Sequence, residues 1–380
     1  MNTVFNPFII SGKIPNAYFC DREAETVQLT NHIQNGRNVL LIAPRRVGKT
    51  GLIDHCFEQS CWESGYYCFS LDILQTSSLR EFIYLFGKCV FETLKPKSRR
   101  MLDLFMQSVR SITGEFGFDV QTGLPKFSLS LGAIENPEVT LSEIFDYINK
   151  ADKRCLVAID EFQQITRFPE KNVEAILRSH IQKCSNANFI FAGSERHILS
   201  EMFTLPARPF YASTSMISLE EIPMEKYQDF VTEHFEEFDK TIDGDCVPFV
   251  YALVGGNTYC LQKVFNVAYG MTPIGANCNK EMVQQAIRSV LLENERFYRN
   301  QLSLLSSKPK ELLYAIAREG KAMKVTSGAF VKEHKLHSAS SVQSATKQLL
   351  DADWITYSSS SDGQKQYSLT DPFLMLWLQQ

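Results

Sequence analysis

Lys49 and Thr50 are the first residues in the sequence whose types and spacing indicate a chemistry. They end the segment APRRVGKT, residues 43–50, which fits the phosphate-binding pattern G-x-x-x-x-G-K-[ST] at every position but the first. In such a loop, backbone N–H groups bind phosphate oxygens, the lysine reaches the β- and γ-phosphates, and the hydroxyl binds Mg²⁺. We therefore expect a site for ATP and Mg²⁺. The residues expected to bind the nucleotide are Ala43, Pro44, Arg45, Arg46, Val47, Gly48, Lys49, Thr50 and Gly51.

The departure from the pattern is Ala43. Glycine serves at this position because it accepts unusual backbone angles and lets the chain approach the phosphate. Alanine adds one methyl group, so we expect the loop to form with some strain or with weaker affinity. A chance basic turn is the alternative. However, an apolar run at 39–42 precedes the loop and apolar residues at helical spacing follow it, which is the strand–loop–helix order that the motif requires.

Asp160 and Glu161 form the acidic pair expected to act at the same site. They follow the apolar run 155–159, and ligands bind at the carboxyl ends of strands in open α/β sheets. Asp160 suits the Mg²⁺ shell, directly or through water. Glu161 suits a general base that orients and activates the attacking water. Acidic pairs also end strands without any catalytic role. The phosphate loop favours the catalytic interpretation, with the two segments meeting where two adjacent strands end.

Three further residues are candidates for the site. Ser194 follows the apolar run 188–193, where an ATPase places a sensor of the γ-phosphate; the structural interpretation is a helix cap for Glu195 onward, and the two roles are compatible. Arg208 lies in the loop before the strand predicted at 215–219 and could stabilise phosphate charge in its own or a neighbouring subunit. A solvated loop arginine is the alternative there. Arg22 opens a predicted helix. It either lines the adenine side of the nucleotide pocket or belongs to a solvated first turn of that helix.

These residues need a scaffold of alternating strands and helices, which predicts an α/β fold: a P-loop NTPase three-layer core with a parallel sheet. Asp21 is the expected N-cap of a first helix that extends to about residue 36, with Val27, Leu29 and Ile33 facing inward. Asp72 ends a second core strand. The other elements predicted here are helices at 78–93 and 141–150, a basic helix with Arg99 and Arg100, and a hairpin within 115–131 with a turn at Thr122 and Gly123.

The composition is that of an ordinary globular protein. The chain has 380 residues and a net charge of −4, which allows two or three domains and argues against a generally basic nucleic-acid-binding protein. Ten cysteines occur without framework spacing, C-x-x-C pairs or a secretory leader, so we expect thiols in a reducing compartment. No apolar run is long enough to span a membrane, and a cytoplasmic location is expected.

The C-terminal part changes to helical patterns and ends in a predicted hairpin. Residues 308–380 carry nine Lys/Arg and seven Asp/Glu, which gives 9 − 7 = +2, and the helix predicted at 340–351 has no arginine. Since phosphate neutralisation supplies most of the affinity for DNA, we favour protein contacts over DNA for this domain. The expected domains are a P-loop core at 1–220 with an inserted hairpin at about 112–135, a helical lid at 221–303 and a winged helix at 304–380.

Seven segments of the sequence, taken in order, resemble the prokaryotic archaeal-type ATPase family, a branch of the AAA+ and STAND-like P-loop ATPases. The resemblance implies an ATPase core, a helical lid and a winged helix, with the roles given above for the phosphate-loop residues and the acidic pair, and the sensor role for Ser194. The matching segments are FCDRE, APRRVGKT, LVAIDEFQ, FAGSE, LEEIPMEKYQDFV, GGNTYCLQ and YSLTDPFLMLWL. The positions that depart from the family pattern are Asp21, Ala43 and Thr258.

The leading hypothesis is an Mg²⁺-dependent ATPase that works as a conformational switch on a protein partner. The alternatives are a DNA-binding regulator controlled by nucleotide and a scaffold that binds nucleotide without hydrolysis. The sequence leaves open GTP as the nucleotide, the biological process, and assembly into a homo-oligomer.

Overall fold

The computed structural model describes residues 6–62, 64–94, 115–118, 125–128, 134, 136–359 and 363–380. The chain divides into two compact units. One is Lys13–Glu220, and the other joins Glu221–Gln380 to the N-terminal segment that ends at Gly12. The N-terminal segment therefore belongs to the same unit as the C-terminal part of the chain.

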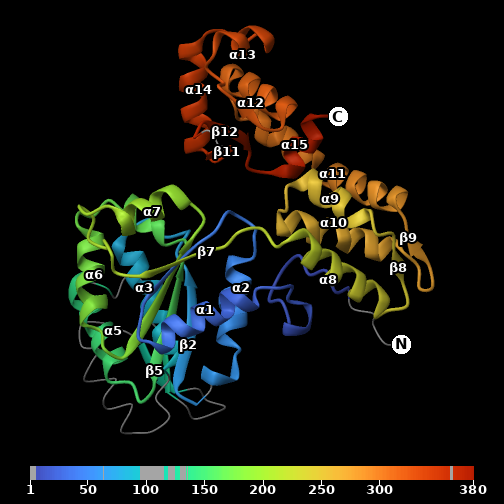
Figure 1. Cartoon of the computed structure of the whole chain (residues 1–380). Coiled ribbons are helices and arrows are strands. Elements are labelled where there is room, and N and C mark those ends of the chain that lie inside the picture. The colour runs from blue at the N-terminus through green and yellow to red at the C-terminus, as the bar shows by residue number, and fades with distance from the viewer. Residues whose placement is uncertain are drawn as a thin grey trace. The chain divides into compact units, whose positions relative to one another are not determined.

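The unit Lys13–Glu220 is built on a five-stranded sheet (Figure 1). Its strands are β1 (Val39–Ile42), β2 (Tyr66–Asp72), β5 (Arg154–Asp160), β6 (Ala187–Gly193) and β7 (Ser215–Ser218). The order is β2-β5-β6-β1-β7, and every neighbouring pair runs parallel. The carboxyl ends of all five strands therefore lie at one edge of the sheet. Because β6 lies between β1 and β5, the prediction that the phosphate loop and the acidic pair follow adjacent strands is wrong.

Helices cover both faces of this sheet, because its strands are apolar on both sides. The helices are α1 (Glu23–Gln34), α2 (Lys49–Phe57), α3 (Leu79–Thr93), α5 (Pro137–Asn149), α6 (Val173–Lys183) and α7 (Arg196–Thr204). Leu40 and Ile42 of β1 belong to the core shared with α3, α5, α6 and α7, whereas Val39 and Leu41 belong to the core shared with α1 and α2. The alternation along the strand produces the predicted three-layer α/β core.

The start of α1 differs from the prediction. Asp21 is not its N-cap: Asp21 and Arg22 have φ angles of 56° and 79°, and Arg22 takes the N-cap position without a capping side chain. This left-handed turn places the Arg22 side chain in the protein interior, where 4% of the residue is exposed. The turn therefore serves to bury an arginine rather than to cap the helix with an aspartate.

Val27, predicted to face inward, is 58% exposed, whereas Leu29 and Ile33 are buried as predicted. The buried stripe of α1 runs through Thr26, Leu29 and Ile33. Successive helical residues are about 100° apart around the axis, so position 27 lies outside this stripe. The neighbours of Val27 at helical spacing include Glu23, Thr30 and Asn31, so its apolar type alone does not place it in the core.

The inserted hairpin is present. β3 (Glu115–Phe118) and β4 (Pro125–Ser128) pair in antiparallel fashion, within the range predicted from the alternating pattern. The basic helix predicted around Arg99 and Arg100 and the turn predicted at Thr122 and Gly123 lie outside the described residues.

The second unit begins with a set of helices around buried aromatic rings. These elements are α8 (Met224–Glu236), β8 (Thr241–Ile242), α9 (Cys246–Val254), α10 (Thr258–Met271), β9 (Asn277–Cys278) and α11 (Lys280–Ser303). Phe8 of the N-terminal segment is fully buried, with its ring 5.9 Å from Phe230 and 6.0 Å from Phe265. Asn6 and Asn266 fix this segment, since Asn6 donates to the Asn266 carbonyl and Asn266 donates to the Phe8 carbonyl.

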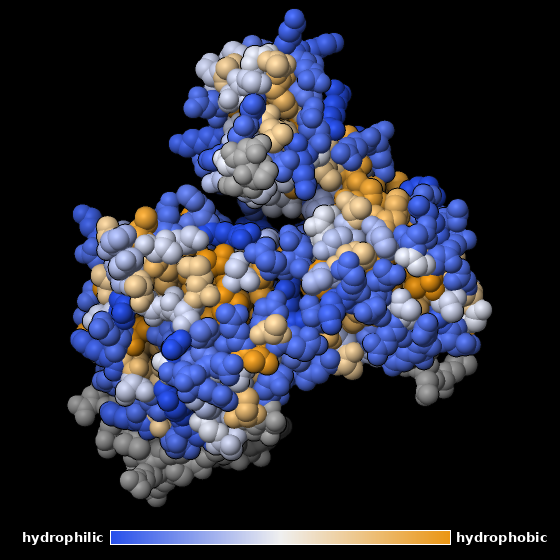
Figure 2. Space-filling model, viewed as in Figure 1, coloured by the Kyte–Doolittle hydropathy of each residue, from blue (hydrophilic) through white to orange (hydrophobic). Residues whose placement is uncertain are grey.

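The last part of the second unit has the winged-helix order. Its elements are α12 (Ser307–Glu319), β10 (Ala322–Met323), α13 (Gly328–Glu333), α14 (Ala339–Asp351), β11 (Ile355–Ser359), β12 (Lys365–Leu369) and α15 (Pro372–Leu378). The predicted hairpin of β11 and β12 gains β10 as a third strand, in the order β10-β12-β11. Figure 2 shows hydrophilic residues over most of the visible face, with apolar ones in small separate areas. Among the described residues, no helix has the length and apolar character needed to cross a membrane.

Candidate active site

The phosphate loop connects β1 to α2, as the motif predicts. Positive φ angles occur at Arg46 (65°) and at Gly48 (93°), which is the N-cap of α2. These angles turn the chain sharply into the helix, whose unpaired first-turn N–H groups form an anion site. Ala43 is fully buried and does not have a positive φ. Its methyl group packs in the core beside β1, so alanine at this position requires no left-handed backbone.

Lys49 lies between the two carboxylates of the acidic pair. Its Nζ atom is 2.6 Å from Asp160 Oδ1 and 3.0 Å from Glu161 Oε1. The Thr50 hydroxyl donates a hydrogen bond to Asp160 Oδ2 at 2.9 Å. The structure therefore brings Lys49, Thr50, Asp160 and Glu161 together, although β6 separates the strands that carry them.

Glu161 is held at both carboxylate oxygens and has a left-handed backbone, with φ 54° and ψ 41°. Oε1 accepts from Lys49, while Oε2 accepts from Gln163 at 2.5 Å and from the Ser194 hydroxyl at 3.0 Å. Burial raises the pKa of this carboxyl, but the Lys49 ammonium and three side-chain hydrogen bonds outweigh burial and hold the pKa below the ordinary 4.5. Glu161 is therefore ionised at neutral pH, as a base must be.

Ser194 joins the site from the end of β6. Besides its bond to Glu161, its hydroxyl accepts a hydrogen bond from Arg45 Nε at 3.3 Å. Its neighbour Glu195, rather than Ser194, is the N-cap of α7, and no side chain caps that helix. The structure thus connects Ser194 to Glu161 and to the phosphate loop. The predicted cap role is wrong, and the sensor role stays a prediction.

Arg22 is not a solvated first-turn residue, because 4% of it is exposed, and its place on the adenine side of the pocket stays a prediction. Its guanidinium is buried and donates to Glu25 Oε1 at 2.7 Å and to the Glu220 carbonyl at 2.6 Å. A longer contact of 3.4 Å reaches the carbonyl of Val47 in the phosphate loop. Arg22 therefore connects the loop backbone to the end of the first unit, and it is not a solvated first-turn residue.

Arg208 pairs with Glu174 of α6, and its Nε lies 3.2 Å from Glu174 Oε2. Burial raises the pKa of the Glu174 carboxyl, and the Arg208 charge opposes this increase. The Arg208 side chain is 31% exposed, so its guanidinium contacts solvent as well as a carboxylate partner. Its role toward phosphate charge stays a prediction.

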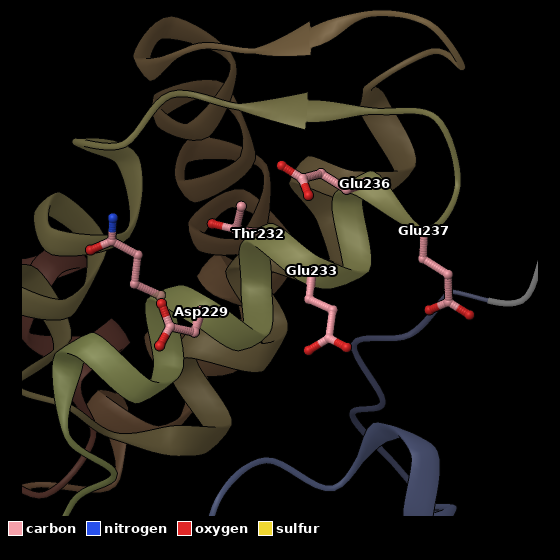
Figure 3. A pocket seen from close by; sticks show the side chains of 6 residues that line it. Asp229, Thr232, Glu233, Glu236 and Glu237 are labelled. Carbon is pink, nitrogen blue, oxygen red and sulfur yellow. The ribbon is translucent and has the colours of Figure 1, made fainter.

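The donor set at Thr50 and Asp160 fits Mg²⁺, which prefers hydroxyl, carboxylate and water oxygens. Two other features of the described residues do not fit a nucleotide. An open hollow along α8 is lined mainly by carboxylates, which repel phosphate (Figure 3). The residues lining it are Gln228, Asp229, Thr232, Glu233, Glu236 and Glu237. A group of Glu319, Glu333 and His334 lies in the winged helix, and its two exposed carboxylates likewise repel phosphate.

Together, the parallel sheet, the phosphate loop and the acidic pair at one sheet edge define a P-loop nucleoside triphosphatase fold. The sequence matches the profile of an ATPase domain predominantly from Archaea over residues 19–264, and a winged-helix domain profile over residues 296–380. The chain belongs to this archaeal-type ATPase family, and the resemblance inferred from the motifs is confirmed.

Solved structures share the fold at low sequence identity. The Walker-type ATPase Paby2304 of Pyrococcus abyssi is 17% identical with a TM-score of 0.67, covering 98% of this chain and 100% of that one. The Aeropyrum pernix ORC2 protein, in ADPNP–ADP complexes, is 14% identical with a TM-score of 0.61 and coverage of 98% and 96%. The ORC1 protein of the same organism, in complex with DNA, is 14% identical with a TM-score of 0.50 and coverage of 95% and 92%. The search of curated proteins found no significant match.

One residue of the site was missed. Gln163 appears in the matching segment LVAIDEFQ, but the sequence reasoning gave it no role. A glutamine two residues after the acidic pair, between the apolar Phe162 and Ile165, is a signal that could have identified it. Its side chain is 1% exposed and bonds to Glu161.

Proposed function

We propose that this protein is an Mg²⁺-dependent ATPase that works as a nucleotide-driven conformational switch on a protein partner. The observation that carries the proposal is the convergence of four side chains. Lys49 contacts Asp160 at 2.6 Å and Glu161 at 3.0 Å, and Thr50 contacts Asp160 at 2.9 Å. The family and fold support nucleotide hydrolysis in general. The choice of ATP, the metal and the switch role are the finer parts of the proposal.

Each side chain of the site has a separate role in the proposed hydrolysis of ATP. The loop N–H groups and Lys49 bind the β- and γ-phosphates, so the phosphates compete with the two carboxylates for the Lys49 ammonium. Thr50 and Asp160 would hold Mg²⁺, which when bound would neutralise charge on the phosphate oxygens. Glu161 accepts a proton from the attacking water, while Ser194 holds the other carboxylate oxygen.

The test is single-turnover hydrolysis of ATP with Mg²⁺. Glu161→Gln keeps the size of the side chain but removes the base, and we expect the rate to fall by about 10²- to 10⁴-fold. The matched control is Glu201→Gln, a half-buried carboxylate of α7 that pairs with His197, which should leave the rate within about twofold of the wild type. An unchanged rate in Glu161→Gln shows that the assigned base is wrong.

The same assay distinguishes the alternative of a non-hydrolysing scaffold. The ionised Glu161 and the Thr50–Asp160 bond argue for hydrolysis. If the wild type binds ATP tightly but shows no turnover above that of Glu161→Gln, the protein is a scaffold. A comparison of ATP with GTP in the binding step settles which nucleotide it takes.

The winged helix favours a protein partner over DNA. On α14, Gln343, Ser344 and Lys347 are exposed, so this helix offers one cation to a DNA backbone. Phosphate contacts supply most of the affinity in DNA binding and make it strongly dependent on salt. A duplex titration at two salt concentrations should therefore show no specific binding. Tight binding that weakens steeply with salt supports the DNA-binding regulator instead.

The proposed mechanical division is a core at 1–220, a lid at 221–303 and a winged helix at 304–380. Arg208 is proposed to act on phosphate charge from its own or a neighbouring subunit, which requires release from Glu174. Mixing Arg208→Ala with Glu161→Gln tests the second case: recovered hydrolysis in the mixture supports an arginine supplied by a neighbour in a homo-oligomer.

A further inference from the structure

Gln163 is a buried polar residue beside the proposed base. It lies in the 3₁₀ helix Phe162–Arg167 that follows Glu161, and its side chain is 1% exposed. Its Nε2 atom donates to Glu161 Oε2 at 2.5 Å and lies 3.5 Å from Glu195 Oε1. Glu195 is itself fixed by two hydrogen bonds from Arg167. The amide donors of Gln163 therefore face two carboxylates, one of which is the base.

The structure makes room for this amide. A Cβ atom at Gly193, the last residue of β6, would clash with Gln163 Oε1 and lie 2.6 Å from Leu199 Cδ1. Among the described residues, Gln163 Oε1 has no hydrogen-bond partner. Leaving a buried acceptor unpaired costs free energy that an apolar side chain of the same size avoids. A glutamine stands here despite this cost, and the group that it supplies is the Nε2 hydrogen-bond donor to Glu161.

The base needs such a donor. Glu161 has a left-handed backbone, which is rare for a residue with a side chain. Its side-chain direction depends on the bonds at the carboxylate, and Lys49 holds Oε1. A triphosphate draws Lys49 toward the phosphates and leaves Oε2 as the anchored oxygen, bound by Gln163 and Ser194.

We propose that Gln163 is a positioning residue: its amide holds Glu161 Oε2 so that Oε1 faces the attacking water. The inference rests on the proposed ATPase function. In the step itself, the water oxygen bonds to the γ-phosphorus, its proton moves to Glu161 Oε1, and the bond from the γ-phosphorus to the bridging oxygen breaks to release ADP. Gln163 neither gives nor takes a proton in this step.

The test compares Gln163→Met with Gln164→Met. Gln164 is the next residue; it donates to the Thr76 carbonyl and accepts from Arg167 Nη1, so its variant loses two hydrogen bonds, neither of which involves the base. In single-turnover hydrolysis of ATP with Mg²⁺, Gln163→Met should be at least about tenfold slower with an ATP affinity within about twofold of the wild type. Gln164→Met should keep the rate within about twofold. Equal rates in Gln163→Met and the wild type overturn the inference.

A double-mutant cycle separates positioning from a structural role. In the Glu161→Gln background, Gln163→Met should lower the rate no further, because there is no base to position. An equal fold-loss in both backgrounds overturns the inference while leaving the ATPase proposal intact. If Glu161→Gln itself hydrolyses ATP as fast as the wild type, the proposed function fails instead.

A measurement without nucleotide tests the bond directly. Urea unfolding of the wild type, Gln163→Met, Glu161→Ala and the double variant gives the coupling between the two side chains. A coupling above about tenfold in the unfolding equilibrium constant is expected for a charged hydrogen bond. Additive effects overturn the inference. Gln163→Leu serves the same cycle if the methionine variant fails to fold.

Discussion

Lys49 Nζ lies 2.6 Å from Asp160 Oδ1, and both side chains are nearly buried, with exposed fractions of 7% and 11%. Asp160 also accepts a hydrogen bond from the Thr50 hydroxyl. One carboxylate therefore contacts the cation proposed to bind phosphate and the hydroxyl proposed to bind the metal. Substituting this carboxylate separates its effect on the metal from its effect on the phosphates.

Asp160→Asn should weaken binding of ATP with Mg²⁺ by about tenfold or more, because the metal loses a charged ligand. In EDTA the same variant should bind ATP at least as tightly as the wild type, because a negative charge near the phosphates is gone. Calorimetric titration with and without Mg²⁺ measures both. The same dependence on Mg²⁺ in the variant and the wild type rules out Asp160 as a metal residue.

Gly193→Ala should destabilise the protein by about 1–3 kcal/mol, because its new methyl group meets Gln163 and Leu199 in a packed region. Hydrolysis should slow as well, since Gln163 must move. Gly65→Ala is the matched control in the same unit, because a Cβ at that position has open space around it. Thermal unfolding of both variants checks the difference. Equal melting temperatures would show that Gln163 and Leu199 accommodate the new methyl group without loss of stability.

His180 predicts a pH dependence of stability. Burial lowers the pKa of this α6 histidine below the ordinary 6.5, Lys183 lowers it further, and Asp146 and Glu138 oppose this. The unfolded chain then binds a proton at a pH where the folded protein does not. Stability should therefore rise with pH through the window just below 6.5 and level off above it.

In the variant His180→Gln, the free energy of unfolding should lose the part of its increase with pH that is due to His180. Urea unfolding measured between pH 5 and 8 checks this. His197→Gln replaces a histidine of the same unit that is 71% exposed at the side chain, and the slope due to His180 should persist in it. An identical slope in the wild type and His180→Gln contradicts the prediction.

The sequence predicts much of this site because its signals are local. The apolar run of β1, the loop and α2 are contiguous, so a strand–loop–helix unit can be predicted without tertiary information. The meeting of Lys49 with Asp160 and Glu161 follows from a general property of parallel sheets, whose carboxyl strand ends share an edge. The strand order does not follow in this way, and β6 lies between the two strands predicted to be adjacent.

The parts that could not be predicted depend on contacts between distant segments. The burial of Arg22 depends on the Glu220 carbonyl, 198 residues away in the sequence. The contact of Gln163 with Glu161 depends on Gly193 at the end of β6, which leaves space for the Gln163 amide.

Lys49 is the proposed phosphate-binding cation, and titration of ATP with Mg²⁺ into Lys49→Ala tests this role directly. Truncating a buried charged partner typically costs about 2–5 kcal/mol, so the affinity should fall by well over tenfold. Lys13→Ala, at a lysine whose side chain is 59% exposed, should bind like the wild type. If Lys49→Ala binds ATP with Mg²⁺ as tightly as the unaltered protein, the proposed site is wrong.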